Sequence, residues 1–207
     1  NEQNVNGIIL AAGLSSRMHS FKPLLKIKEK TIIEYCIDNM INAGINQIVV
    51  VLGYRAKEIE AFLISKYRYS NIVFVYNEEY ETTDMLTSIK IGISALGICD
   101  AFYILPGDMP AINIETFIKV REAMDISGAL VAFPTIKGRR KHPPLISWKC
   151  KKYILSFEGY DGLRGVWGEY EKKNKIVTTP VDDFGCMIDA DTKEDFNILV
   201  DYMNMKN

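Results

Sequence analysis

The most informative segment of the sequence is the apolar run Gly7-Ile8-Ile9-Leu10-Ala11, which continues into Ala12-Gly13-Leu14-Ser15-Ser16-Arg17-Met18. An almost unbroken apolar run is typical of a parallel strand whose two faces are both covered by helices. Runs of this kind recur along the chain with helical patterns between them. The sequence therefore predicts a three-layer α/β/α fold around a twisted, mostly parallel sheet.

The other elements follow from the spacing of apolar residues. Short apolar runs predict strands at residues 47–52, 72–76, 101–105 and 129–135. Spacings of three and four predict helices at residues 31–43, 56–67, 85–96 and 115–127. Near the C-terminus we expect a short strand at Met187-Ile188 and then a helix capped by Asp191 and Glu194. Residues 138–144 and 158–168 are predicted to be loops that cover or line a site.

Composition narrows the class of protein. With 207 residues, 48% of them hydrophobic and 25% charged, residues 1–207 are expected to form a single globular domain. A net charge of -1 favours neither nucleic acid nor an anionic membrane as a partner. The chain lacks an apolar run of the ~20 residues that a membrane helix needs, so we expect a cytoplasmic protein. Its four cysteines have no paired spacing, which predicts reduced, packed thiols.

The small residues after the first strand form a candidate phosphate loop. Their backbone can approach a ligand closely and offer amides to a phosphate or a base edge. The loop matches neither the P-loop nor the dinucleotide-binding pattern, which argues against an ATPase or a dehydrogenase. Arg17 and Lys22 follow it, where two cations can meet a triphosphate. The alternative is that both are solvated surface bases.

Two acidic turns are candidates for a metal site. Asp108 follows the strand at 101–105 in the stiff turn Pro106-Gly107-Asp108-Met109-Pro110, and Asp189 precedes the last helix. Mg²⁺ is usually held by one or two carboxylates together with phosphates. In a sheet ordered 3-2-1-4 the first and fourth strands are neighbours, so Gly13, Lys22 and Asp108 would converge. A turn or helix-capping aspartate is the alternative for each acid.

Three weaker candidates lie elsewhere. Ser88, early in a predicted helix, offers a hydrogen bond to a nucleotide, although residues 77–88 also fit a plain polar connector. His142 follows three basic residues, 139–141, which suit an anionic acceptor or a solvated turn. Arg164 lies in the glycine-rich stretch 159–165, which fits a lid or an ordinary loop.

Taken in order, these segments resemble the MobA-like nucleotidyltransferases over nearly the whole chain, and especially the molybdenum cofactor cytidylyltransferases. The loop and its downstream Lys22-Pro23-Leu24-Leu25 resemble the family's L-A-A-G-x-S-x-R-M signature and lysine. Supporting matches are the Asp108 turn, His142-Pro143, and residues 189–195 for the ending D-I-D-T-P-E-D. The sequence departs from the family at Asp84, where many relatives have glycine, at Lys193 in place of proline, and at residues 159–162, which match the G-D-x-G loop only loosely.

The resemblance implies the nucleotide-diphospho-sugar transferase fold and a Mg²⁺-dependent transfer of a nucleoside monophosphate, with release of pyrophosphate. CTP is the favoured donor, with GTP as the other candidate, and the implied acceptor is a molybdopterin-type cofactor. By the same resemblance, Arg17 and Lys22 stabilise the triphosphate, Asp108 and Asp189 hold Mg²⁺, and His142 and Ser88 contact substrate. The residues that read the nucleotide are then Leu10, Ala11, Ala12, Gly13, Ser15 and Ser16.

Two alternatives stay open at this point. A sugar- or polyol-phosphate nucleotidyltransferase can share this fold and metal site. A non-catalytic maturation factor for a molybdenum hydroxylase is the other; Asp84 motivates it, while Lys22 and Asp108 argue against it.

Overall fold

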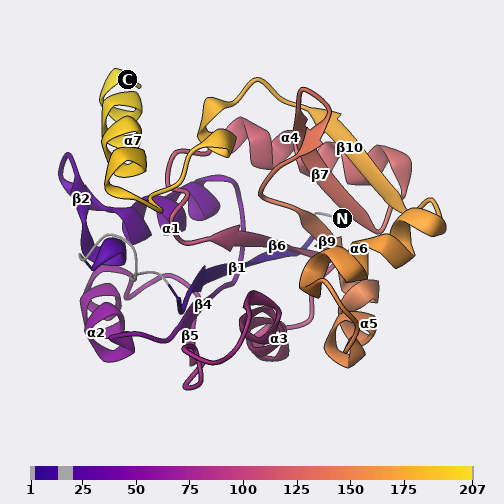
Figure 1. Cartoon of the computed structure of the whole chain (residues 1–207), viewed down its shortest axis with the longest axis horizontal. Helices are drawn as coiled ribbons and strands as arrows, with labels where there is room; N and C mark the ends of the chain where they lie inside the picture. Colours follow the sequence, from indigo (N-terminus) through magenta and orange to yellow (C-terminus); the bar gives the residue numbers. More distant parts are fainter. Residues whose placement is uncertain (1–2, 14–20, 207) are drawn as a thin grey trace.

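The computed structural model describes residues 3–13 and 21–206, and its central feature is an eight-stranded sheet (Figure 1). The strand order is β10-β7-β9-β6-β1-β4-β5, with β8 paired to β7. The strands are β1 (Val5–Ala11), β4 (Ile48–Leu52), β5 (Ile72–Tyr76), β6 (Ala101–Pro106), β7 (Val131–Ile136), β8 (Arg139–Arg140), β9 (Leu145–Ser147) and β10 (Ile176–Pro180). The prediction that the first and fourth strands are neighbours is confirmed. The predicted fourth strand is β6, and β1 pairs in parallel with β6 on one side and with β4 on the other.

Helices cover both faces of the sheet, as predicted. Side chains from α1 (Ile32–Asn42), α2 (Ala56–Lys66) and α4 (Ile114–Ser127) pack on one face, and those from α3 (Met85–Ala95), α5 (Lys151–Ser156) and α6 (Gly162–Lys172) on the other. Every residue of β1 and β4 is buried, which is what their unbroken apolar runs require.

A third, smaller cluster lies at one end of the molecule. It joins α7 (Lys193–Met205) to the small hairpin of β2 (Lys26–Ile27) and β3 (Lys30–Thr31), through Leu199 and Met203 against Ile27. Figure 1 shows α7 beside this hairpin, away from β10. The last helix is thereby held against the hairpin and the start of α1, through Ile27 and Ile32.

The structure corrects several sequence predictions after Pro134. Residues 158–168 are largely not a loop, because α6 begins at Gly162. The basic stretch contains the short strand β8, and β9 enters the sheet antiparallel between β6 and β7. Met187-Ile188 is not a strand; the 3₁₀ helix η3 (Phe184–Met187) ends there. The final helix is capped by Thr192 with Asp195, not by Asp191 with Glu194.

Two predictions about the cysteines and the membrane can be compared with the structure. All four cysteines are free and buried, as expected. Within residues 3–13 and 21–206, none of the helices is both long and apolar enough to cross a bilayer.

Candidate active site

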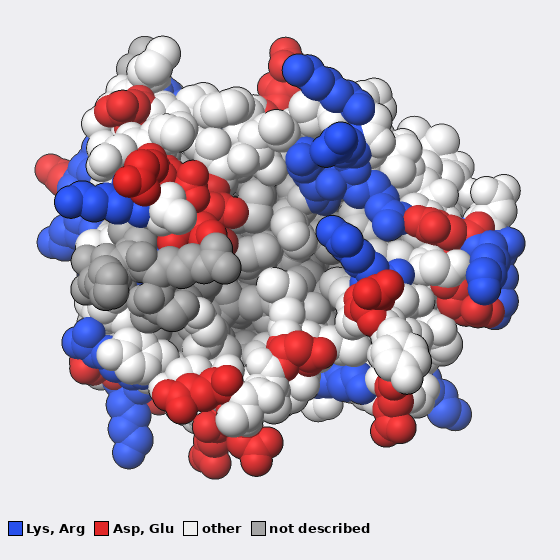
Figure 2. Space-filling model, in the orientation of Figure 1, with Lys and Arg blue, Asp and Glu red and all other residues white. Residues whose placement is uncertain are grey.

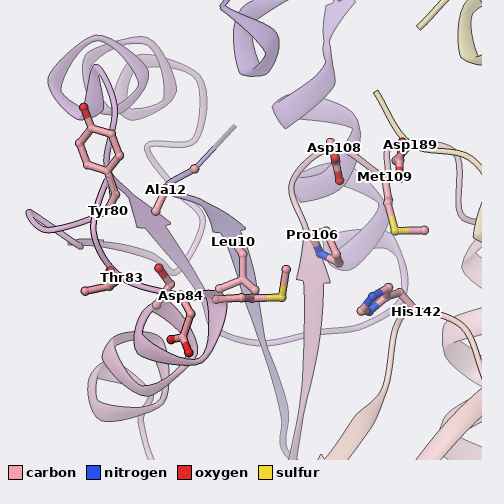
Figure 3. A pocket seen from close by; sticks show the side chains of 13 residues that line it. Leu10, Ala12, Tyr80, Thr83, Asp84, Pro106, Asp108, Met109, His142 and Asp189 are labelled. Carbon is pink, nitrogen blue, oxygen red and sulfur yellow. The ribbon is translucent and has the colours of Figure 1, made fainter. Parts of the chain in front are cut away.

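A pocket of about 360 Å³ opens at the carboxyl ends of β1 and β6 (Figure 3). Leu10, Ala12 and Gly13 form its floor. One side, which we call the α3 wall, consists of Tyr80, Thr83, Asp84, Met85 and Ser88. The opposite side, the β6 wall, consists of Pro106, Asp108, Met109, His142 and Asp189. The pocket therefore lies where ligands bind in open α/β sheets.

Strand pairing explains why the floor and the β6 wall meet. Leu10 lies opposite Pro106 in the parallel register, and the N–H of Gly107 donates to the carbonyl of Leu10 at 2.8 Å. The turn after β6 is thus tied directly to the end of β1. The carboxylate of Asp108 consequently lies beside the small-residue loop, as the sequence predicts.

The charge of one acid of the β6 wall, Asp189, acts on the other, Asp108. Burial raises the pKa of Asp108 to about 6, the charge of Asp189 adds to that rise, and the charge of Lys22 opposes it. Burial also raises the pKa of Asp189, while a hydrogen bond from the N–H of Asp191 opposes the rise. Two like charges in a poorly solvated pocket mark a place where a cation would bind favourably.

Lys22 is the buried cation of this region. It begins the 3₁₀ helix η1 (Lys22–Leu24), its residue is only 3% exposed, and its Nζ lies 3.7 Å from a carboxylate oxygen of Asp191. Lysine is rarely buried without a partner or a function. Its effect on both Asp108 and Asp189 shows that the ammonium lies within electrostatic reach of the β6 wall.

The α3 wall is held by hydrogen bonds of its own. Asp84 is the N-cap of α3, and its Oδ1 accepts from the N–H and the hydroxyl of Thr87, each at 3.0 Å. Ser88 is 6% exposed, and its Oγ accepts from the side chain of Asn77 at 3.0 Å. The hydroxyl proton of Ser88 remains available to a ligand in the pocket.

His142 lines the pocket from the β6 wall and precedes a cis peptide bond to Pro143. Its Nδ1 is buried and has no hydrogen-bond partner in the described part of the chain. Burial lowers the pKa of His142, and the nearby charge of Lys141 lowers it further. The imidazole is therefore neutral at physiological pH.

None of the three basic residues before His142, at positions 139–141, lines the pocket. Arg140 pairs with Glu171 and stacks over Phe133 at 4.8 Å, so its guanidinium is engaged away from the floor. Arg164 lies in α6 and does not line the pocket. Figure 2 shows basic side chains along one side of the central hollow and acidic side chains along the other.

The donor set fits a hard cation held jointly with a substrate. The described residues contain no cluster of three or more histidine, cysteine or acidic side chains able to enclose a metal ion. Asp108 and Asp189 offer carboxylate oxygens on one wall, and Mg²⁺ commonly binds through one or two carboxylates plus phosphate oxygens. These residues fit a Mg²⁺ ion that a triphosphate completes.

Four further residues predicted for the site, at positions 11 and 15–17, are not among the described residues that line the pocket. Ser15, Ser16 and Arg17 lie outside the described residues. Ala11 is described, but its side chain packs in the core on the α1 face and does not line the pocket.

The sequence did not single out several residues that the structure brings to the site. Tyr80, Thr83, Met85 and Met109 line the pocket. Asp191, interpreted as a helix cap, faces Lys22 instead. A buried lysine at the start of η1 requires an acidic partner, and that requirement is the signal that could have found Asp191.

Comparison with known proteins identifies the family to which the chain belongs. Residues 7–174 match the model of the MobA-like NTP transferase domain. The chain belongs to this family of nucleotidyltransferases. This MobA-like protein is 29% identical over 194 residues to the molybdenum cofactor cytidylyltransferase of Escherichia coli strain K12, which covers 93% of each chain.

One further relative is named for a different acceptor, and one solved structure has the same fold. The 2-aminoethylphosphonate cytidylyltransferase of Lancefieldella rimae is 34% identical over 111 residues, which is 49% of this chain and 44% of that one. A solved nucleotidyl transferase from Methanothermobacter superposes with a TM-score of 0.82 over 99% of both chains, at 20% identity. The structural neighbours share the nucleotide-diphospho-sugar transferase fold.

Proposed function

We propose that this protein is a Mg²⁺-dependent cytidylyltransferase of the cytoplasm that transfers CMP from CTP to a molybdopterin-type cofactor and releases pyrophosphate. The observation that carries the proposal is that Asp108 and Asp189 line the pocket at the end of β1 and that the charge of the buried Lys22 acts on both of them. The similarity over 93% of each chain to a molybdenum cofactor cytidylyltransferase supports this choice of donor and acceptor.

The pocket suggests how its residues act. The backbone N–H groups of Ala12 and Gly13 bind the nucleotide at the floor of the pocket. The hydroxyl of Ser88 donates a hydrogen bond to the nucleotide from the α3 wall. Lys22, which is buried beside Asp191, stabilises the negative charge that develops on the departing pyrophosphate. Asp108 and Asp189 would hold Mg²⁺, which would stabilise the negative charge that develops during the transfer. The acceptor phosphate attacks directly, so the protein forms no covalent intermediate and acts through position and charge.

Pyrophosphate release with each of the four NTPs, with and without a molybdopterin-type acceptor, tests this function. The proposal expects release only with acceptor and Mg²⁺, with CTP giving the highest kcat/KM. Equal rates with and without acceptor, or preference for an NTP other than CTP, would reject the assignment of substrate.

A second candidate is transfer of CMP to another phosphorylated or phosphonate acceptor. The match to a 2-aminoethylphosphonate cytidylyltransferase favours it, although that match covers only 49% of this chain. Adding 2-aminoethylphosphonate and sugar 1-phosphates to the same assay separates the two candidates.

A further inference from the structure

A buried carboxylate outside the pocket has no role in the function proposed above. Asp183 is only 3% exposed and satisfies several donors at once. Its Oδ2 accepts from the N–H of Asn113 at 2.8 Å and from the hydroxyl of Thr116 at 2.6 Å, and its Oδ1 accepts from the N–H of Gly185 at 2.9 Å. The thiol of Cys186 is 3.6 Å from Oδ2.

These partners belong to two segments that are far apart in the sequence. Asn113 and Thr116 begin α4, directly after the turn that carries Asp108. Gly185 and Cys186 belong to residues 181–192, which we call the C-terminal arm and which crosses from β10 to α7 (Figure 1). Asp183 therefore joins the start of α4 to the arm.

The arm lies directly against the Asp108 turn. A Cβ added at Gly185 would lie 2.0 Å from the carbonyl oxygen of Ala111, so the two backbones are in close contact. Farther along the arm, the N–H of Ala190 donates to the carbonyl of Asp108 at 3.0 Å. The residue before Ala190 is Asp189, the second acid of the β6 wall.

We propose that Asp183 is a positioning residue that fixes the separation of Asp108 and Asp189, and so sets the affinity of the pocket for a divalent cation. The inference rests on the proposed metal-binding function of those two acids. Asp183 touches neither the pocket nor the substrate; it acts by holding the arm on the turn.

A carboxylate suits this role better than a neutral side chain. The N-cap residue of α4, Asn113, makes no side-chain capping bond, so Asp183 supplies the acceptor and the negative charge that a helix N-terminus favours. The nearby cation is Lys206, whose Nζ donates to the carbonyl of Ala111 at 2.8 Å. Both oxygens of Asp183 are used: Oδ2 accepts from the start of α4, and Oδ1 accepts from the N–H of Gly185 within the arm.

The test compares Asp183→Asn with Thr116→Val in the full chain. Asparagine offers one acceptor oxygen and turns an NH₂ group towards the donors on the other side, so it weakens the junction between α4 and the arm. Thr116→Val removes one donor of the same network but leaves α4 joined to the arm through the bond from the N–H of Asn113 to Asp183. It therefore controls for a general loss of stability.

Two measurements report the position of the arm. Hydrogen exchange at the amide of Ala190 should accelerate by about 10-fold or more in Asp183→Asn and by less than about 3-fold in Thr116→Val. The dissociation constant for Mn²⁺, measured by calorimetry on the metal-free chain, should rise by about 10-fold in the first variant only.

Unchanged exchange at Ala190 in Asp183→Asn, or equal changes in the two variants, would overturn the inference. If the wild-type chain bound no Mn²⁺, the proposed metal site would fail, while the exchange result would still decide whether Asp183 anchors the arm. Should Asp183→Asn not fold, Asp183→Glu keeps both oxygens and the charge but displaces them by one methylene. Faster exchange at Ala190 in that variant supports the anchor, and wild-type exchange rejects it.

Discussion

The two walls of the pocket hold their acidic residues in opposite ways. On the α3 wall, Asp84 is exposed and its charge lies at a helix N-terminus, where it accepts two hydrogen bonds from Thr87. On the β6 wall, burial and the charge of Asp189 raise the pKa of Asp108. The carboxylate of Asp84 stabilises the fold, whereas the ionised carboxylate of Asp108 costs stability unless a cation joins it.

This difference separates a structural acid, Asp84, from Asp108, the acid that we propose to bind a metal ion. A side chain whose charge is satisfied within the protein has an evident role in stability. A pair of acids kept close together with a buried lysine nearby is explained by a ligand that brings positive charge. The following changes test the contrast between the walls.

The largest effect is expected from Asp108→Asn. The variant keeps the size of the side chain but removes a metal-binding charge, so Mg²⁺-dependent pyrophosphate release should fall by about 1000-fold. Asp84→Asn, the matched change on the α3 wall, should keep release within about 3-fold of wild type because its exposed charge is screened. Full maturation of a molybdenum hydroxylase by the Asp108 variant would instead favour the non-catalytic maturation factor.

A smaller loss is expected from Lys22→Met. Methionine fills the buried volume without the charge, so kcat should fall by about 100-fold with little change in thermal stability. The exposed Lys26, four residues later, provides the control, and Lys26→Met should behave like wild type. A raised KM for CTP with an unchanged kcat would contradict this role, because it would show that Lys22 binds the ground state and the transition state equally.

The pH dependence of stability should differ between wild type and Asp108→Asn. The folded pKa of Asp108, about 6, lies above its ordinary value of 3.8, so the folded chain binds more protons between these pH values. Without metal, ionisation of Asp108 therefore destabilises wild type as the pH rises through 6, by on the order of 2 to 3 kcal/mol. Urea unfolding in EDTA should find the asparagine variant more stable at pH 7.5 and the difference nearly gone at pH 4.

The smallest effect concerns the α3 wall. Asp84→Ala removes the N-cap of α3 and should lower the free energy of unfolding by about 1 kcal/mol, whereas Asp84→Asn should preserve it because asparagine also caps helices. Thermal unfolding of both variants measures the difference. Equal destabilisation by alanine and asparagine would show that the charge of Asp84, and not its hydrogen bonds, supports the helix.

The part of the fold that the sequence predicts best is the part held by continuous apolar runs. Residues 72–76 form β5 as predicted, and the helices that follow β4, β5 and β6 begin within one residue of their predicted starts. The fully buried strands β1 and β4 carry this signal in their own, largely apolar composition, so no knowledge of their neighbours is needed.

The sequence fails where distant partners decide the local structure. The two residues of β8 and the three of β9 are strands only because β7 and β6 pair with them. The glycines of α6 suggest a loop, yet a Cβ at Gly165 would lie 2.2 Å from the carbonyl oxygen of Tyr160, so close packing explains that glycine inside a helix.

In the candidate site, too, the residues that could be predicted are those placed by the parallel strands, and the residues that could not are those placed by contacts between distant segments. Gly13 and Asp108 could be brought together from the sequence because the topology of parallel strands places their turns side by side. The α3 wall could be predicted only at Ser88, since Tyr80 and Thr83 reach the pocket through the turn that joins β5 to α3. The pairing of Lys22 with Asp191 spans almost the whole chain and follows from no local pattern.

The central claim is that Asp108 and Asp189 hold one divalent cation against a triphosphate that lies on the end of β1. Anomalous diffraction from crystals grown with Mn²⁺ and a non-hydrolysable CTP analogue tests it most directly. We expect a single Mn²⁺ peak at roughly 2.0–2.3 Å from carboxylate oxygens of both acids, with the triphosphate beside Gly13 and Lys22. A Mn²⁺ peak distant from Asp108, or a triphosphate bound outside this pocket, would contradict it.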